Sequence, residues 1–377
     1  MKKVAFLTNS MGGGGAERIV AGLGDYFSKD NSMEAEMILF ERNDFYRPGQ
    51  HLKINYLGNF TGKESPVVKL LSLPLLAWKL KKYIKENKID VVQSHLYRAN
   101  YVNIIAQLMG SKHKSQIVNH DNFFRRYQKS YFGRMKLKLV KTFYKKADKI
   151  IAISEDMKDG IEELLGRRVE KINNPYDMEM MEKLALEEVT DLPKDRRYIV
   201  TVGRLISLKR VEDVIEGYSK IANRYPDYEL LILGEGSERG KLEELSKIMG
   251  VENKVRFMGR VENPFKYLAI SDVFVMASES EGFPNVLIEA MACGCQVVST
   301  DCISGPREIM APEAYERIRE VYKGKYGMLI PVGDVDGISV ALERILEGHV
   351  TFDVRKRAGD FGRDIIMKRY REVLLND

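Results

Sequence analysis

Residues 279–298 read ESEGFPNVLIEAMACGCQVV. This stretch predicts a turn, then a helix and then the start of a strand. Pro284 suits the first turn of a helix. The run from residue 285 to residue 293 is apolar except for two side chains, and a helix that is apolar nearly all round is buried. The CQVVSTD segment (295–301) then predicts a buried strand, so this stretch indicates an α/β fold.

The same stretch places two carboxylates in different settings. Glu281 lies on the turn, whereas Glu289 lies in the apolar helix, four residues after Asn285 and on the same helical face. A buried carboxylate needs partners. Three uses remain open for Glu289: a structural pairing with an arginine or backbone amides, a glycosidase-like pair with Glu281, or a hydrogen bond to the hydroxyls of a ribose.

Outward from this stretch, short apolar segments alternate with helical ones along the chain. Strands are predicted in the first half at 2–9, 34–41, 89–95, 115–121 and 149–155, with helices at 16–29 and 131–146. The second half has predicted strands at 198–204, 228–236, 254–260, 273–280 and 295–301. Strands alternating with helices imply parallel sheets that are covered on both faces. We expect two doubly wound units, which bind ligands at the carboxyl ends of their strands.

The length of 377 residues favours two domains. We expect a first Rossmann-like domain at 1–175, a charged and turn-rich linker at 176–195, and a second Rossmann-like domain at 196–360. A C-terminal helix at about 361–377 could pack back on the first domain.

The composition is that of an ordinary globular protein, but its charge is uneven. Residues 1–150 carry 27 Lys and Arg against 12 Asp and Glu, a net +15, and the remainder carries 33 against 42, a net −9. This asymmetry indicates an anionic partner for the first half. Three clustered cysteines favour a reducing compartment, and the short apolar N-terminal stretch is too short for a signal peptide or a membrane span. We therefore expect a cytoplasmic protein.

Two loops have residues that suit phosphate. The MGGGGAER loop (11–18) joins a strand to a helix, where glycines permit close backbone approach and a helix N-terminus attracts anions. Glu41, near the end of the second strand, would suit a dinucleotide's ribose, but Arg18 occupies the third-glycine position of that motif. A purely structural turn therefore remains an alternative for this loop.

The GRLISLKR segment (203–210) carries the second phosphate signal. Arg204 follows a predicted strand and Lys209 comes five residues later. Two cations at the carboxyl end of a strand suit a diphosphate, Arg as a planar fork and Lys as a movable point charge. Two solvated surface cations would produce the same pattern.

Taken together and in order, these motifs resemble glycosyltransferase family 4, the retaining nucleotide-sugar glycosyltransferases of GT-B fold. The resemblance extends over nearly the whole chain, through DVVQSH, IVNHD, IAISE, INNPYD, VGRLISLK, LGEGSER, VRFMGRV and EGFPNVLIE. The later CISGPREI is similar to the subgroup that builds bacterial polysaccharides and lipid-linked oligosaccharides. The resemblance implies two Rossmann-like domains that face each other across a cleft.

The resemblance also implies roles for individual residues. Arg204 and Lys209 match the cations that grip the donor diphosphate, and Glu289 matches the residue that binds the ribose hydroxyls. Glu281 and His120 match an acid and a histidine that face the donor sugar. The remaining donor-binding positions that it implies are Gly14, Gly15, Phe283, Pro284 and Asn285.

The implied reaction transfers the sugar with retention of configuration and without a metal or other cofactor. The departing phosphate oxygen would help to deprotonate the acceptor, so catalysis would rest on positioning and electrostatics. Two departures from the family pattern are the run of four glycines in the first loop and Arg210, which stands where the family usually has glycine. Arg210 could be a third cation near the diphosphate or a surface residue.

Two basic segments in the first half combine lysines with apolar side chains, at 66–88 and 125–149. Such segments suit an anionic membrane surface, with contacts expected from Lys79, Lys81, Lys82, Lys136, Lys138 and Lys141. Nucleic acid would attract the same charges, but no nucleic-acid motif accompanies them, so we expect no nucleic-acid partner. A solvated cationic face is the structural alternative.

The sequence thus predicts a GT-B hexosyltransferase or other glycosyltransferase that works peripherally at the inner face of the cell membrane. Its expected donor is a nucleotide diphosphate sugar, UDP-hexose or UDP-N-acetylhexosamine for example, and its expected acceptor is a lipid-linked glycan or polysaccharide. The alternatives are a GT-B-like sugar-nucleotide epimerase and a non-enzymatic basic protein that binds membranes or nucleic acid.

Overall fold

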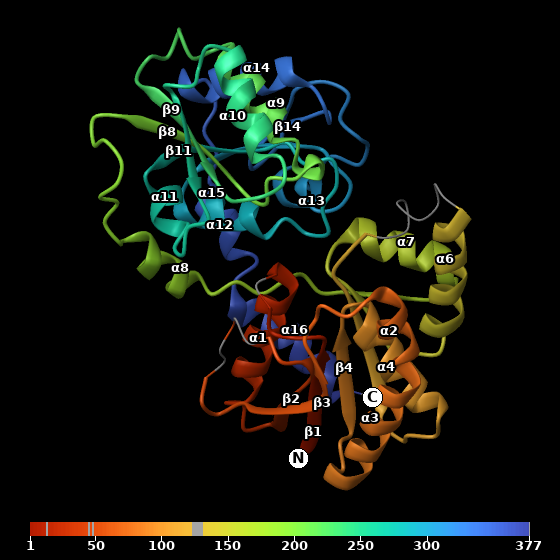
Figure 1. Ribbon diagram of the computed structural model, residues 1–377. Coiled ribbons are helices and arrows are strands. Elements are labelled where there is room, and N and C mark those ends of the chain that lie inside the picture. The colour runs from red at the N-terminus through yellow and green to blue at the C-terminus, as the bar shows by residue number, and fades with distance from the viewer. Residues whose placement is uncertain (13, 44–45, 47–48, 123–130, 377) are drawn as a thin grey trace. The chain divides into compact units, whose positions relative to one another are not determined.

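The computed structural model describes the chain except for residues 13, 44–45, 47–48, 123–130 and 377 and the side chain of residue 132 (Figure 1). The chain forms two compact units, each described here by itself. The first contains Met1–Asn174 and Ile366–Asp377, and the second contains Pro175–Ile365. Residues 176–195, expected as a linker, include a helix and belong to the second unit.

The first unit is built on a seven-stranded parallel sheet with the order β3-β2-β1-β4-β5-β6-β7. Its strands are β1 (Lys2–Thr8), β2 (Met33–Glu41), β3 (Lys53–Phe60), β4 (Val91–His95), β5 (Lys114–Asn119), β6 (Lys149–Ala152) and β7 (Glu170–Lys171). Five of these match the predicted strands. The two missed strands, β3 and β7, are the edge strands of the sheet; β3 is only partly buried and β7 has two residues.

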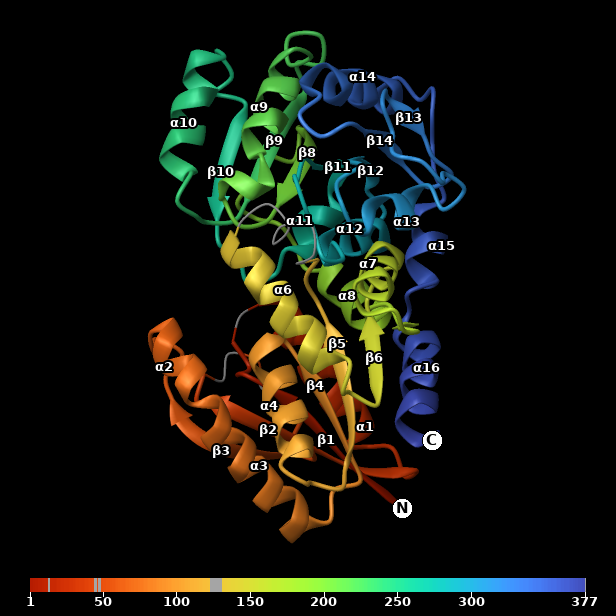
Figure 2. The ribbon, with the colours of Figure 1, turned by 90° about the vertical axis from the view of Figure 1, so that its right-hand side faces the viewer.

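Helices cover both faces of this sheet, as expected for a parallel sheet (Figure 2). One face is covered by α3 (Leu73–Asn87), α4 (Tyr97–Leu108) and α6 (Tyr131–Tyr144), with α4 in contact with both others. The short helix α2 (Pro66–Leu71) precedes α3. The remaining helices are α1 (Gly15–Phe27), α7 (Glu155–Leu165) and the C-terminal α16 (Arg363–Leu375).

The second unit repeats the design with the strand order β10-β9-β8-β11-β12-β14-β13. Its strands are β8 (Arg197–Val202), β9 (Tyr228–Leu233), β10 (Val255–Gly259), β11 (Ser271–Met276), β12 (Gln296–Thr300), β13 (Tyr322–Lys323) and β14 (Met328–Ile330). All pair in parallel except β13 with β14. The predicted strands of this half are all present.

The second unit also contains several helices besides its sheet (Figure 1). They are α8 (Met178–Ala185), the 3₁₀ turn η1 (Ser207–Lys209), α9 (Val211–Ser219), α10 (Arg239–Ile248), α11 (Phe265–Ala269), α12 (Asn285–Cys293), α13 (Pro306–Met310), α14 (Val335–Leu346) and α15 (Val354–Gly359). The prediction that α12 is buried is confirmed, since six of its nine residues are buried. No helix in the described part of the chain is both long and apolar enough to span a bilayer.

Parallel pairing brings the carboxyl ends of the central strands to one edge of each sheet. In the second unit, two glycines allow the loops at this edge to touch. A Cβ added to Gly234, whose φ is +143°, would lie 1.8 Å from the carbonyl oxygen of Gly203. One added to Gly236 would lie 2.1 Å from the carbonyl oxygen of Leu205. The loop after β9 therefore packs directly on the backbone of the loop after β8.

Candidate functional site

The loops after β8, β11 and β12 are tied together by backbone hydrogen bonds at the carboxyl edge of the second sheet. The amide of Glu279 donates to the carbonyl of Leu208 at 2.9 Å, and the amide of Glu281 donates to the carbonyl of Ile303 at 3.1 Å. Side chains far apart in the sequence are thereby held at one place.

Glu281 and Lys209 form an ion pair at this edge. The Nζ atom of Lys209 lies 2.6 Å from Oε1 of Glu281, and the hydroxyl of Ser278 donates to the same oxygen at 2.6 Å. Both charged side chains are largely withdrawn from water, with 21% of Lys209 and 12% of Glu281 exposed. The pair thus holds an ammonium and a carboxylate in fixed positions. Ser278 was not among the predicted site residues.

Arg204, the other predicted cation, follows β8 and is exposed. No residue in the described part of the chain forms a hydrogen bond or ion pair with its side chain. Its guanidinium therefore remains available to a ligand, in contrast to Lys209.

Arg210 does not join the other two cations. Its guanidinium forms a two-pronged ion pair with Asp213, at 2.7 and 2.9 Å. Its φ is +46°, in the left-handed region. Glycine adopts this conformation at little cost, which explains why glycine suits this position. The structure thus favours a structural role for Arg210 over a third diphosphate contact.

The N-terminus of α12 faces this edge without a side-chain cap. Pro284 is its N-cap residue, one position before the predicted first turn, and this N-cap residue makes no side-chain hydrogen bond to the helix start. Phe283 is buried, and its ring lies 5.6 Å from that of Phe361. Asn285 accepts a 2.6 Å hydrogen bond from the hydroxyl of Tyr176. An uncapped helix start attracts anions and hydroxyl oxygens.

Glu289 lies one turn further along α12 and is 5% exposed. The predicted placement on the same helical face as Asn285 follows from the helix that the structure shows. The carboxylate also helps to keep the neighbouring Cys293 thiol protonated, because burial and then Glu289 raise the pKa of Cys293 to about 12. All three cysteines are buried and unbridged, as small packing residues would be.

In the first unit, Gly14 and Gly15 lie at the start of α1, where Gly14 is the N-cap. A Cβ added to Gly14 would come within 2.2 Å of a carboxylate oxygen of Glu17. This carboxylate therefore lies over the glycine loop and must move if an anion is to approach it. Gly13 lies outside the described residues.

His120 follows β5 and pairs with His95 at the end of β4. The Nδ1 atom of His95 lies 2.9 Å from Nε2 of His120. Burial lowers the pKa of His120 to about 4 and that of His95 well below its usual value, where the neighbouring His120 adds to the effect. Both rings are therefore neutral near pH 7, and one shared proton joins them. Sequence analysis missed His95, although its place at a strand end was a signal.

The burial of a third histidine, His113, leads to a prediction about the stability of the protein. Its Nε2 atom lies 2.7 Å from Oδ1 of Asn103 and its Nδ1 atom 3.0 Å from the hydroxyl of Ser111. Burial lowers the pKa of His113 to about 4. An unfolded histidine takes up a proton below about pH 6.5, so His113 stabilises the fold fully above that pH and loses this effect toward pH 4.

We expect the free energy of unfolding to fall between about pH 7.5 and pH 5, with His113 responsible for about 2 kcal/mol of the fall. His113→Gln should reduce the fall by that amount, whereas the exposed His51→Gln should not. Urea unfolding followed by the fluorescence of Trp78, the only tryptophan and part of the first unit, measures this. An unchanged fall in His113→Gln would contradict the prediction.

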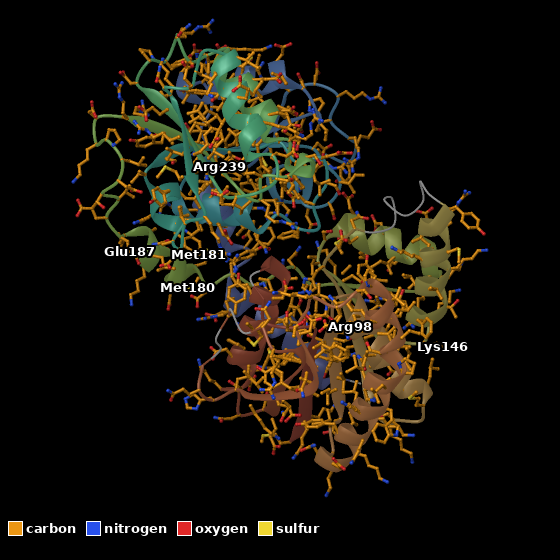
Figure 3. The ribbon with its side chains drawn as sticks, viewed as in Figure 1. Arg98, Lys146, Met180, Met181, Glu187 and Arg239 are labelled. Carbon is orange, nitrogen blue, oxygen red and sulfur yellow. The ribbon has the colours of Figure 1, made fainter. Side chains whose placement is uncertain are left out.

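Glu41 is engaged by an arginine of its own unit, which leaves it poorly placed to bind a ribose. Its carboxylate receives a 2.9 Å hydrogen bond from Arg98, and both side chains are 9% exposed. Arg98 also lies 4.6 Å from the ring of Phe60. Burial raises the pKa of Glu41 and lowers that of Arg98, so desolvation outweighs their attraction. The dinucleotide interpretation of Glu41 is therefore disfavoured. Figure 3 shows Arg98 inside the first unit.

The six predicted membrane-facing lysines fall into two groups. On α3, Lys79 and Lys81 donate to the backbone carbonyls of Leu57 and Met109, at 3.0 and 2.6 Å. Lys82 lies 3.8 Å from Glu86. The α6 lysines, Lys136, Lys138 and Lys141, are exposed. Lys79 and Lys81 therefore make structural contacts, which the sequence did not indicate, whereas Lys82 remains exposed. Part of the basic segment 125–149 lies outside the described residues.

No group of three or more His, Cys, Asp or Glu that could hold a metal ion occurs among the described residues.

Comparisons with known proteins match the chain over its length. Residues 13–180 match the family model described as Glycosyltransferase Family 4, and residues 182–364 match Glycosyl transferases group 1. A Campylobacter jejuni protein is 33% identical over 92% of this chain and 91% of its own length. It is named N-acetylgalactosamine-N,N'-diacetylbacillosaminyl-diphospho-undecaprenol 4-alpha-N-acetylgalactosaminyltransferase. The lipopolysaccharide 1,6-galactosyltransferase of Salmonella typhimurium is 25% identical over 93% of this chain and 91% of its own length.

Solved structures resemble the fold closely. Sucrose-phosphate synthase from Thermosynechococcus elongatus superposes with a TM-score of 0.80 and 19% identity, over 100% of both chains. Anabaena HepE in complex with UDP superposes with a TM-score of 0.77 and 20% identity, over 99% of both chains. These likenesses confirm the predicted α/β fold of two Rossmann-like domains.

Proposed function

Because this chain belongs to glycosyltransferase family 4 and is therefore a glycosyltransferase, we propose that it builds a bacterial surface glycan. In this proposal it moves a sugar from a nucleotide diphosphate sugar to a lipid-linked or polysaccharide acceptor, with retention of configuration. A UDP-linked hexose or N-acetylhexosamine is the proposed donor. HepE, whose fold is similar, was solved with UDP bound. The Campylobacter jejuni relative is named for an undecaprenol-linked acceptor.

The observation that carries the proposal is the Lys209–Glu281 ion pair at the carboxyl edge of the second sheet. It lies in the loops that lead to the uncapped start of α12. An ammonium held beside a carboxylate can bind two parts of one donor, the diphosphate and the sugar hydroxyls. A donor phosphate would compete with Glu281 for the ammonium, and the three N–H groups of lysine allow it to hold both.

The proposed donor contacts divide by chemistry. Arg204 and Lys209 would bind the diphosphate and stabilise the charge that develops as it leaves. Glu289 would accept hydrogen bonds from the ribose hydroxyls, and the buried position of its carboxylate would strengthen them. Gly14 and Gly15 of the first unit would let the backbone approach the phosphates, with the Glu17 carboxylate displaced.

Two residues would act at the sugar itself. Glu281 and the backbone near Phe283, Pro284 and Asn285 would hold its hydroxyls, and His120 would contribute from the first unit. Because the pKa of His120 is lowered to about 4, its ring would be a neutral hydrogen-bonding group near pH 7. The departing phosphate oxygen would accept the proton of the acceptor hydroxyl. This proposed mechanism requires no metal or cofactor.

The proposed acceptor side lies on the basic first unit, at the cytoplasmic face of the membrane. The lysines at 79, 81, 82, 136, 138 and 141 would meet anionic headgroups or the acceptor's phosphates. Because Lys79 and Lys81 hold backbone carbonyls, we assign the larger electrostatic share to the α6 lysines. No nucleic-acid partner is proposed.

A panel of UDP- and GDP-sugars tests the proposal. Nucleotide release should require one donor and should increase when an undecaprenol-linked glycan is added, and the product's anomeric configuration should match the donor's. Conversion of the donor sugar without acceptor would instead indicate an epimerase. A protein that left every donor intact would act as a binding protein, and the proposal would fail.

A further inference from the structure

Helix α2 exposes its apolar side chains. None of its six residues is buried, and the exposed fractions are 64% for Val67, 46% for Val68, 62% for Leu70 and 73% for Leu71. A helix on a water-facing surface usually buries its apolar residues and exposes its polar ones. A six-residue helix is also too short to be stable in water by itself. The surroundings of α2 must therefore explain its position.

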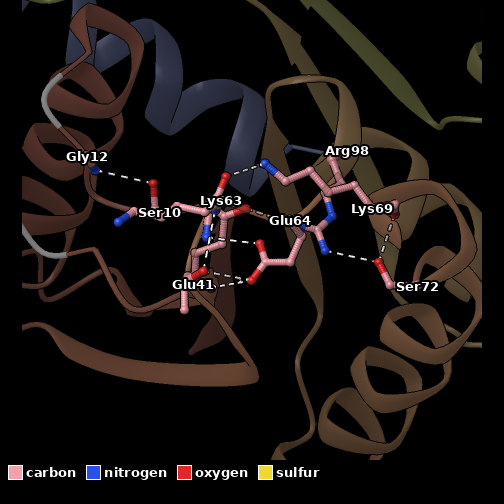
Figure 4. Close-up of polar contacts among 10 residues, drawn as sticks. Ser10, Gly12, Glu41, Lys63, Glu64, Lys69, Ser72 and Arg98 are labelled. Carbon is pink, nitrogen blue, oxygen red and sulfur yellow. Dashed lines mark hydrogen bonds and ion pairs between the residues drawn. The ribbon is translucent and has the colours of Figure 1, made fainter. Parts of the chain in front are cut away.

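The polar side chains of this segment are turned toward the protein instead (Figure 4). Lys69 donates to the carbonyl of Gly62 at 2.6 Å, and the hydroxyl of Ser72 accepts a 3.0 Å hydrogen bond from Arg98. Arg98 is in turn fixed by Glu41 at 2.9 Å. The helix is thus held by its polar side, so it cannot roll to bury its valines and leucines without breaking these bonds.

The exposed apolar surface continues into α3. Leu71, Leu75 and Trp78 follow one another at intervals of four and three residues, which places them on one helical face. Leu75 and Trp78 are each 54% exposed, while Leu76 and Leu80 on the inner face are buried. The surface formed by Val67, Val68, Leu70, Leu71, Leu75 and Trp78 is called the α2–α3 apolar surface below.

Positive charge borders this surface. Residues 63–88 contain seven lysines and two glutamates, and Lys82 and Lys85, which follow Trp78, are exposed. One of the two glutamates, Glu64, is bound to the amides of Thr61 and Gly62. A helix with exposed aliphatic side chains, a tryptophan at its border and lysines beyond it matches a segment that lies in a membrane interface.

We propose that the α2–α3 apolar surface inserts into the hydrocarbon region of a bilayer that contains anionic lipids. Val67, Leu70 and Leu71 would lie among the acyl chains. Trp78 would lie at the boundary, and Lys82 and Lys85 would lie at the headgroups. A partner protein or a second copy of the chain could also cover apolar residues, but the inward-facing polar side chains and the basic border favour lipid.

This inference deepens the proposed function, because it assigns the contact through which the enzyme reaches a lipid-linked acceptor. It differs from electrostatic attraction by surface lysines, since insertion buries apolar side chains. Its test measures membrane binding without any sugar transfer, so its failure and that of the proposed function are distinguishable.

Trp78 supplies the measurement, because it is the only tryptophan of the chain. The full-length protein would be mixed with phosphatidylcholine vesicles, with or without phosphatidylglycerol, and with bromine atoms placed on the acyl chains. We expect a blue shift of the emission with the anionic vesicles, and quenching by the acyl-chain bromines. Quenching should persist at high salt once the protein is bound.

Matched variants test the role of the leucines. Burying one leucine in hydrocarbon should raise the vesicle partition coefficient about tenfold to a hundredfold, so Leu71→Ser should lower it by that factor. Leu70→Ser with Leu71→Ser should lower it further. Ile248→Ser is the control, because Ile248 is also 73% exposed but belongs to the second unit. Its partition coefficient should equal that of the wild type.

Three results would overturn the inference. The first is Trp78 emission that neither vesicle changes. The second is vesicle binding that occurs without quenching by the acyl-chain bromines. If high salt abolished this binding, and if the combined variant Lys136→Gln, Lys138→Gln and Lys141→Gln removed it, the protein would only adsorb to the charged surface. The third is a dimer in sedimentation whose Trp78 emission is already blue-shifted and moves to the red on dilution, which would make a second copy the occupant.

Discussion

Lys209→Ala should lower kcat/KM by about 30-fold to 1,000-fold, equivalent to about 2–4 kcal/mol of transition-state stabilisation. The physical reason is that a contact to the leaving phosphate strengthens as negative charge gathers on it. Arg204→Ala should cause a loss in the same range, because its exposed guanidinium has no competing partner among the described residues. Steady-state transfer rates with a saturating acceptor measure both losses.

The neighbouring arginine provides the control for this prediction. Arg210 follows Lys209 directly but is bound to Asp213, so Arg210→Gln should retain most of the activity. Circular dichroism should show that all three variants are folded. A near-normal rate in Lys209→Ala, or an equal loss in Arg210→Gln, would refute the assignment of the diphosphate contact.

The two glutamates should separate nucleotide binding from transfer. Glu289→Gln should weaken the binding of free UDP or GDP by about tenfold to a hundredfold, because charge-assisted hydrogen bonds to the ribose are lost from a buried position. Glu281→Gln should leave that affinity unchanged or raise it. Its carboxylate competes for Lys209 at 2.6 Å, and the variant would release the ammonium to the phosphates.

In contrast to nucleotide affinity, the rate of sugar transfer should fall strongly when Glu281 is replaced. Glu281→Gln should lower kcat by about a hundredfold or more, since a group that contacts the reacting sugar acts in the transition state. Calorimetric titration with the nucleotide and transfer assays on both variants provide the two readouts. Equal losses of nucleotide affinity in the two variants would show that the proposed division of roles is wrong.

The repeated α/β architecture was predictable from local sequence patterns. Runs such as VAFL in β1 and VFVM in β11 are apolar on both faces, which only a covered parallel strand requires. Burial of α12 was equally evident from its composition. The polarity of the strand ends also identified the edge at which Arg204, Lys209 and Glu281 lie, because parallel strands bring their carboxyl ends together.

Local patterns could not determine which groups meet or which apolar residues are exposed. Lys209 and Glu281 are 72 residues apart in the sequence. Their contact depends on backbone hydrogen bonds between the loops that follow three different strands. In the same way, the sequence predicted that residues 66–88 suit a membrane surface, but it did not show which of their apolar side chains are exposed. Only the tertiary structure shows that Lys69 and Ser72 are held by the protein and that the leucines of α2 face outward. Hydrophobic pattern specifies that residues seek an apolar environment, but the packing of distant segments decides whether the protein core provides it.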